Sequence, residues 1–221
     1  MQKDTQKKMS DVNKKIVIID YDLGNLLSLK RAIEYIGYNV VISNSENIIN
    51  NSEVIILPGV GSFERGMKNI RKNNLEKVIL KSAKTGKQIL GICLGMQLFF
   101  NESEESNKKI MGLGLIDGKV LNIKNKIKSK DARVPHIGWG NFSFINKKNK
   151  LFNNISVNDY TYFVHSYFAS PKKKQFILAC TKYFNLSIPS VVNSQNITGF
   201  QFHPEKSGSK GLVLLKNYLN K

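Results

Sequence analysis

The chain has 221 residues, of which 41% are hydrophobic, and a formal net charge of +18. This length and apolar content suit one domain with a full hydrophobic core, and no apolar run is long enough to span a membrane. Two cysteines are too few for a disulfide framework, so we expect a reducing, cytoplasmic location. The lysine excess is spread along the chain without an aromatic and basic recognition motif. The charge is the sole support for nucleic-acid binding as an alternative function. We therefore predict no nucleic-acid partner.

The first 14 residues are polar and rich in lysine. They lack the apolar segment of a signal peptide. We interpret residues 1–14 as a mobile polar extension and residues 15–221 as a single domain.

From residue 15 to about residue 100, short β-branched runs alternate with helical patterns. Strands are predicted at residues 15–20, 39–43, 53–59 and 88–92. Helices are predicted at residues 24–37, at 63–86 with a break near Asn73 and Asn74, and from residue 94 onward. Strands that alternate with helices are typical of a parallel α/β sheet.

After residue 110 the pattern changes to short strands separated by turn residues. These strands are predicted within residues 114–123, 140–145, 161–170, 176–183 and 197–204, followed by a closing helix at 211–220. The fold class is therefore α/β, with a mostly parallel central sheet flanked by helices and an antiparallel flank.

Cys93 stands between two glycines in the stretch Gly-Ile-Cys-Leu-Gly, residues 91–95, where a predicted strand gives way to a helix. Reactive groups in parallel α/β sheets lie at the carboxyl ends of the strands. A G-x-C-x-G turn presents a thiol as the G-x-S-x-G turn presents a serine, and a helix N-terminus stabilises a thiolate. The pattern predicts a nucleophile, although five residues alone also fit a buried structural cysteine.

A nucleophilic cysteine requires a base, and the chain has three histidines. His203 is followed two residues later by Glu205, so both side chains project to one side if the run is extended. An imidazole oriented by a carboxylate is the arrangement of a catalytic triad. Alone, the pair also fits an ordinary surface or core position, and His165 is predicted to be a satisfied core histidine.

Three motifs together resemble those of class I, triad-type glutamine amidotransferases: PGVGSF (58–63), GICLGMQ (91–97) and GFQFHPEKS (199–207). Three more resemble the glutaminase subunits of imidazole glycerol phosphate synthase: DYDLGNLLSLKRAIE (20–34), VPHIGWG (134–140) and YFVHSY (162–167). The resemblance covers roughly residues 15 to 220 and implies the flavodoxin-like amidotransferase architecture.

The resemblance implies a role for each matching residue. Cys93 attacks the side-chain amide of glutamine, His203 transfers the proton, and Glu205 holds His203. The implied oxyanion hole comprises Gly59, Val60 and Leu94. The implied glutamine-binding residues are Gly61, Gln97, His165, Ser166 and Tyr167, the last three through their backbone.

The resemblance also implies a partner, a (β/α)8-barrel cyclase subunit that receives the ammonia in histidine biosynthesis. The implied partner interface comprises Asn25, His136, Trp139 and Lys206. The chain departs from the family pattern at two positions. Asp22 stands where the family usually has glycine, and Gly140 follows the tryptophan where the family usually has asparagine.

Two alternative functions share this architecture. A paralogous amidotransferase subunit supplies ammonia to amidinate a bacterial surface sugar, and a non-catalytic scaffold could retain the fold. No cofactor is implied, and the histidines and cysteines lack metal-ligand spacing. Cys180, in an apolar run, is predicted to be a core residue.

Overall fold

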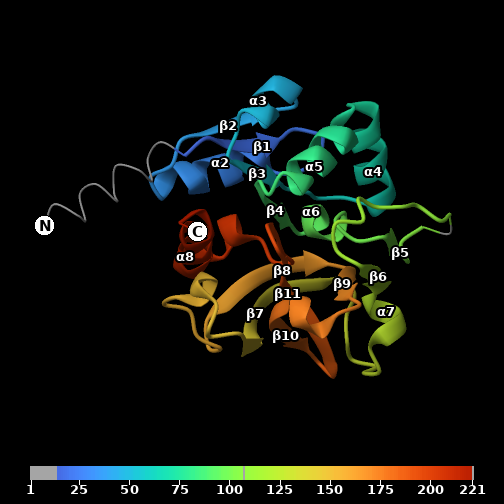
Figure 1. The fold of residues 1–221 in the computed structure, drawn as a ribbon. Helices are drawn as coiled ribbons and strands as arrows, with labels where there is room; N and C mark the ends of the chain where they lie inside the picture. Colours follow the sequence, from blue (N-terminus) through green and yellow to red (C-terminus); the bar gives the residue numbers. More distant parts are fainter. Residues whose placement is uncertain (1–13, 107, 221) are drawn as a thin grey trace, which may run out of the picture.

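The computed structural model describes residues 14–106 and 108–220 (Figure 1). The predicted mobile extension, residues 1–14, therefore lies outside the described residues except for Lys14. The Nζ atom of Lys14 donates to the carbonyl of Leu219 at 2.6 Å. The first described residue is thus tied to the C-terminal helix.

A nine-stranded sheet forms the centre of the structure, in the order β2-β1-β3-β4-β12-β11-β10-β7-β8. In this order the strands are β2 (Val40–Ser43), β1 (Ile16–Ile19), β3 (Val54–Leu57), β4 (Gln88–Ile92), β12 (Ile197–Phe200), β11 (Leu186–Ser194), β10 (Ile177–Tyr183), β7 (His136–Ile145) and β8 (Tyr160–His165). Pairing is parallel from β2 to β12 and antiparallel from β12 to β8. The predicted parallel sheet with an antiparallel flank is confirmed.

A second, three-stranded sheet lies beside the antiparallel half. It contains β5 (Glu102–Ser103), β6 (Gly118–Asn122) and β9 (Tyr167–Pro171), in that order. The chain passes directly from β8 of the large sheet to β9 of the small one. Ser166 is the only residue between these strands, and this junction forms one wall of the site described below.

The helices follow the predicted pattern with two differences. They are α2 (Leu26–Tyr35), α3 (Glu46–Asn50), α4 (Phe63–Lys72), α5 (Leu75–Lys84), α6 (Leu94–Gln97), α7 (Ile123–Lys126) and α8 (Gly208–Leu219), with 3₁₀ turns η1 (Lys150–Phe152), η2 (Lys174–Phe176) and η3 (Pro204–Lys206). Asn74, at φ +56°, separates α4 from α5 at the predicted break. The predicted helix after residue 94 is only four residues long, and the short helices α3 and α7 were not predicted.

Two hydrophobic clusters cover the two faces of the parallel strands. Successive residues of β1 alternate between them, so Ile16 and Ile18 belong to one cluster, and Val17 and Ile19 to the other. The first cluster contains α2 and α8, and the second contains side chains of α3, α4 and α5. Burial on both faces explains why the first strands are continuous apolar runs rather than alternating ones.

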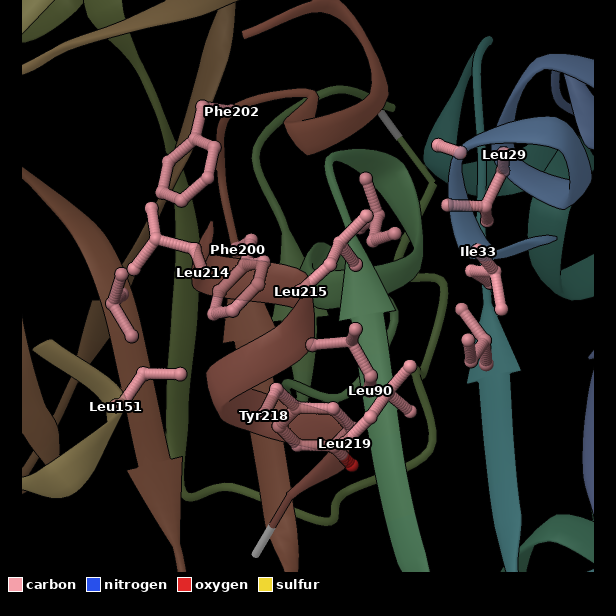
Figure 2. Close-up of a cluster of buried hydrophobic side chains, with 14 of the residues drawn as sticks. Leu29, Ile33, Leu90, Leu151, Phe200, Phe202, Leu214, Leu215, Tyr218 and Leu219 are labelled. Atoms are coloured by element: carbon pink, nitrogen blue, oxygen red, sulfur yellow. The ribbon is translucent and has the colours of Figure 1, made fainter. Parts of the chain in front are cut away.

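Helix α8 packs its apolar side against the centre of the sheet. Figure 2 shows Leu215 and Tyr218 of α8 among Leu29 of α2, Leu90 of β4 and Phe200 of β12. All five side chains are at most 1% exposed. The carboxyl ends of β4 and β12, which carry the candidate catalytic residues, are thereby held on a rigid core.

Candidate active site

Cys93 lies at the apex of a sharp turn between β4 and α6. Its backbone is at φ 54° and ψ −109°, a conformation that residues other than glycine rarely adopt. A Cβ atom at Gly95 would overlap the carbonyl oxygen of Leu57, and one at Gly91 would clash with the ring of Phe99 and the backbone of α6. Both glycines are therefore required by close packing. The predicted elbow is present, with its strain at the position of the nucleophile.

Hydrogen bonds hold the elbow against the neighbouring strand. The N–H of Cys93 donates to the carbonyl of Phe200 at 2.7 Å, and the N–H of Gln97 donates to the carbonyl of Cys93 at 3.1 Å. The Cys93 side chain is buried, and its sulfur lies 3.9 Å from both the carbonyl oxygen of Val164 and Nε2 of Gln201. The sulfur therefore has a defined position between β4, β8 and the end of β12.

His203 and Glu205 form a buried pair. His203 Nδ1 lies 2.8 Å from Glu205 Oε1, and both side chains are 4% exposed. The predicted pairing is present, but the expected extended run is wrong, because β12 ends at Phe200 and Glu205 lies in the 3₁₀ turn η3. The bend after His203 directs the carboxylate back toward the imidazole. Ser207 supports this bend, since its hydroxyl donates to the carbonyl of His203 at 2.6 Å.

The electrostatics of the site favour a charged imidazole. Burial opposes protonation of His203, but interactions with the Cys93 sulfur and the Glu205 carboxylate outweigh it and raise the pKa of His203 to about 10. Among the described residues, His203 Nε2 has no partner that meets ordinary hydrogen-bond limits. This nitrogen, buried beside the sulfur and free of other partners, is the one available for proton transfer. The three triad residues predicted from the sequence are thus brought together.

A cavity of about 240 Å³ opens beside the nucleophile. Its lining comprises Val60, Gly61, Cys93, Leu94, Gln97, Glu105, Pro135, Val164, His165, Ser166 and Tyr167. The lining includes eight residues that the sequence assigned to the site. A space of this size, with a buried thiol at one side, can hold a small polar molecule.

Glu105 is the acidic residue in this lining, and the sequence analysis missed it. One carboxylate oxygen of Glu105 accepts a hydrogen bond from the N–H of Phe63 at 2.5 Å. Burial raises the pKa of Glu105, and the hydrogen bond from Phe63 partly opposes this effect. The only signal in the sequence was an acidic cluster, NESEES, in a chain with a large lysine excess.

The loop at residues 58–61 packs closely against α6. The hydroxyl of Tyr21 donates to the carbonyl of Pro58, and Tyr21 is fully buried. Burial and the charge of Cys93 raise the pKa of Tyr21, so its hydroxyl keeps its proton. Because one peptide unit carries both the carbonyl of Pro58 and the N–H of Gly59, Tyr21 fixes its orientation. The next peptide, which carries the N–H of Val60, joins Gly59 to Val60, and Gly59 has no side chain to hinder its rotation.

Asp22, one of the two departures from the family pattern, lies next to Tyr21. Its φ of 61° explains why glycine is usual at this position. Aspartate is one of the residues that tolerate this conformation, and Asp22 Oδ2 accepts a hydrogen bond from Asn73 at 3.3 Å. The departure therefore preserves the local backbone.

Gln97 and His165 both donate to a single backbone carbonyl in the cavity wall. Gln97 Nε2 lies 2.8 Å from the oxygen of Tyr167, and His165 Nδ1 lies 2.8 Å from the same oxygen. His165 Nε2 pairs with Nδ1 of His136 at 3.2 Å. Burial lowers the pKa of His165 to about 3, so it is neutral at physiological pH. His165 is a satisfied core histidine, as expected.

The four residues expected at a partner interface separate into two groups. Asn25 and Lys206 are exposed, and Trp139 is 55% exposed. His136 is only 4% exposed, with its ring stacked 4.1 Å from that of Tyr183. The side chain of His136 is therefore buried within this chain, and its place near a partner interface stays a prediction.

Outward side chains of β7 and β8 form an exposed apolar patch, which we call the β7–β8 surface. It comprises the exposed side chains of Ile137, Trp139 and Tyr160, together with the half-buried Tyr162. The ring of Trp139 meets that of Tyr162 edge-on at 5.9 Å, and Lys206 Nζ lies 6.0 Å from the Tyr162 ring. The carbonyl of Tyr162 accepts a hydrogen bond from the N–H of His203 at 2.9 Å, so the surface adjoins the triad.

Within residues 14–106 and 108–220, no helix is long and apolar enough to cross a membrane. These residues also contain no group of three or more His, Cys, Asp or Glu side chains suited to hold a metal ion. Cys180 lies in β10 and is partly rather than fully buried, and burial raises the pKa of its thiol.

Comparisons with known proteins agree with this geometry. The family model described as glutamine amidotransferase class-I matches residues 17–221. The imidazole glycerol phosphate synthase subunit HisH of Oceanobacillus iheyensis is 44% identical over 92% of this chain and 97% of its own. The corresponding subunit of Aquifex aeolicus is 40% identical over 93% of this chain and 96% of its own.

Solved structures support the fold. A crystal structure of a glutamine amidotransferase aligns with a TM-score of 0.68 at 16% identity, covering 91% of this chain and 98% of the other. PurLQS from Thermotoga maritima aligns with a TM-score of 0.66 at 19% identity, covering 94% of this chain and 98% of the other.

Proposed function

The chain belongs to the class-I glutamine amidotransferase family, and on that premise we propose that it is the glutaminase subunit of an imidazole glycerol phosphate synthase. The observation that carries the proposal is the convergence of Cys93, His203 and Glu205 beside a small cavity with one acidic wall. Relatives that carry this subunit's name are 40–44% identical over nearly the whole chain. The two free cysteines are compatible with action in the reducing cytoplasm.

Glutamine binds in the cavity with its side-chain amide toward Cys93. The carboxylate of Glu105 receives the α-ammonium group, since an ammonium ion and a carboxylate form a charge-assisted hydrogen bond. An arriving ammonium group also favours the ionised form of Glu105, which burial otherwise disfavours. Gly61 and the backbone at Ser166 and Tyr167 complete the contact with the substrate.

The reaction begins when the thiolate of Cys93 attacks the amide carbon of glutamine. Negative charge moves from sulfur to the carbonyl oxygen, and a tetrahedral intermediate forms. The N–H of Leu94, at the start of α6, and the N–H of Val60 are the donors for this oxyanion. Because the peptide that carries the Val60 N–H follows Gly59, which offers little resistance to its rotation, the orientation of this peptide can set the rate of the reaction.

His203 completes both halves of the reaction. Its Nε2–H gives a proton to the departing amide nitrogen, the carbon–nitrogen bond breaks, and ammonia leaves a γ-glutamyl thioester on Cys93. Neutral His203 then removes a proton from a water molecule, which attacks the thioester and releases glutamate. Glu205 holds the ring in one orientation and stabilises the imidazolium in each half.

The ammonia requires a protected route, because in water at neutral pH it becomes ammonium and loses its nucleophilicity. A (β/α)8-barrel cyclase subunit that docks on the β7–β8 surface would receive it close to the site of release. The surface suits a protein partner because it carries exposed aromatic rings with a lysine at its edge. Asn25, Trp139 and Lys206 are the residues that we propose for this contact.

The direct test is glutamate release from glutamine by the purified chain. It is run alone, and then with the cyclase subunit of the same organism and its ribonucleotide ligand. Stimulation by the cyclase that disappears in Cys93→Ala is the expected result. If a glutamine-analogue electrophile still forms a Cys93 adduct while the cyclase neither binds nor stimulates, the ammonia acceptor is a different one. Amidination of a surface sugar is then the next candidate.

A further inference from the structure

Gln201 is a fully buried polar residue that the mechanism above does not use. It lies between the end of β12 and His203, and its side chain is 0% exposed. Its Nε2 lies 3.9 Å from the sulfur of Cys93, and its Oε1 lies 3.3 Å from Nε2 of Gln97. Burying an amide costs free energy unless its polar atoms are hydrogen-bonded. The position of the Gln201 amide beside the Cys93 sulfur therefore suggests a function for its hydrogen bonds.

The orientation of the Gln201 amide is determined by its neighbours. The carbonyl of Tyr167 can only accept, so the amide nitrogen of Gln97 must face it. The same nitrogen faces Gln201, which must therefore present its oxygen. The NH₂ group of Gln201 is left facing the sulfur of Cys93. The chain of donors and acceptors thus leaves one arrangement rather than two equivalent ones.

The two neighbours at 3.9 Å favour opposite protonation states of Cys93. The carbonyl of Val164 can only accept, so it favours the neutral thiol. The NH₂ group of Gln201 donates toward the sulfur, so it favours the thiolate. A thiolate without a donor on this side would face only the carbonyl oxygen.

Charged and titratable groups act on the same sulfur. The imidazolium of His203 favours the thiolate, and negative charge on the carboxylates of Glu205, which holds His203, and Glu105, in the same cavity lining, opposes it. The charge of Cys93 acts on Tyr21, but the Tyr21 hydroxyl donates its hydrogen bond to the carbonyl of Pro58 and cannot donate it to the sulfur as well. Gln201 is therefore the uncharged donor that supplements His203.

We infer that Gln201 is a further catalytic residue, whose amide N–H donates to the Cys93 thiolate and holds it charged and aligned. The inference rests on the proposed function and adds a group to its mechanism. The same donor acts twice. It maintains the thiolate before attack, and it receives the sulfur again when the thioester breaks and the thiolate is the leaving group.

The test is the pH dependence of Cys93 alkylation by iodoacetamide, with each cysteine resolved by peptide mass spectrometry. Gln201→Leu removes the N–H donor and leaves a side chain of similar size. We expect the pH of half-maximal Cys93 alkylation to rise by about one unit, which corresponds to about 1.4 kcal/mol. Cys180 is an internal control, and its profile should not move.

Thr198→Val is the matched control variant. Thr198 is buried in β12, three residues before Gln201, and its hydroxyl accepts a hydrogen bond from Asn193. Thermal unfolding of both variants shows whether a change in folding accompanies any change in alkylation. Thr198→Val should leave the Cys93 profile in place, whatever it does to stability.

Gln201→Glu keeps the shape and replaces the amide with a group that cannot donate when ionised. It should move the Cys93 profile further than Gln201→Leu, and it serves alone if the leucine variant does not fold. Profiles for both variants that coincide with that of the unsubstituted chain would overturn the inference. The assay needs neither glutamine nor a partner. Failure of the proposed function would appear separately, as absent glutamate release with normal Cys93 alkylation.

Discussion

Removal of the Cys93 sulfur should change the titration of His203. In the folded chain the pKa of His203 rises from its ordinary value of 6.5 to about 10, and the Cys93 sulfur provides part of that rise. The whole rise corresponds to roughly 5 kcal/mol of preference for the imidazolium. In Cys93→Ala only Glu205 remains to oppose the effect of burial. We therefore expect the pKa of His203 to fall well below 10 in this variant.

The other two histidines make this measurement clean. Burial lowers the pKa of His136 to about 4 and that of His165 to about 3, so both stay neutral near and above pH 7. An NMR titration of the ring protons from pH 5 upward should therefore show His203 as the single histidine that changes charge. If its titration midpoint is the same in Cys93→Ala, the sulfur does not stabilise the imidazolium and the reasoning fails.

The same linkage predicts how stability depends on pH. Because the pKa of His203 is raised in the folded state, its contribution is fully present below pH 6.5, the unfolded value, and is lost as pH rises through about 10. The free energy of unfolding in urea should therefore fall between pH 7 and pH 10. The fall should be smaller in Cys93→Ala, and equal slopes in the two proteins would contradict the sign of this argument.

Four other substitutions have expected outcomes. Glu105→Gln should raise KM for glutamine roughly 10- to 100-fold with a smaller effect on kcat, because it removes the charged partner of the α-ammonium group. Gly95→Ala should lower the free energy of unfolding by about 3 kcal/mol, because its Cβ overlaps a backbone carbonyl of β3. Trp139→Ala should weaken cyclase binding roughly 30-fold in a titration without changing Cys93 alkylation. Cys180→Ala should leave glutamate release within a few-fold of the unsubstituted rate, since Cys180 is not among the residues that line the cavity.

A different result would contradict each of these four predictions. An unchanged KM in Glu105→Gln would show that Glu105 does not contact the substrate. An unchanged urea midpoint in Gly95→Ala would mean that the elbow can relax. Equal cyclase affinity with Trp139→Ala would place the partner on another face. A deep loss of activity in Cys180→Ala would mean that the wrong thiol was assigned.

Much of the fold was predictable from local pattern. Short runs such as residues 15–20 and 53–59 are apolar throughout because both faces of a parallel strand are covered. One exception was β11, which no pattern predicted. Its Pro189 lowers the expectation of a strand, yet Pro189 lies opposite Cys180 within the sheet, next to the irregular register of β10. The low preference of proline for strands was overridden because β11 pairs with β10 on one side and β12 on the other.

The sequence by itself was enough to predict Cys93, His203 and Glu205 as the proposed triad. The glycines around Cys93 and the spacing of His203 and Glu205 reflect requirements of backbone geometry and proton transfer, which must be met by particular residue types. Tertiary structure decided which other groups face the sulfur and the substrate. Glu105, Gln201 and the inward side of His136 carry no short-range signal, because burial, bond orientation and pKa depend on elements that meet only when the sheet is assembled.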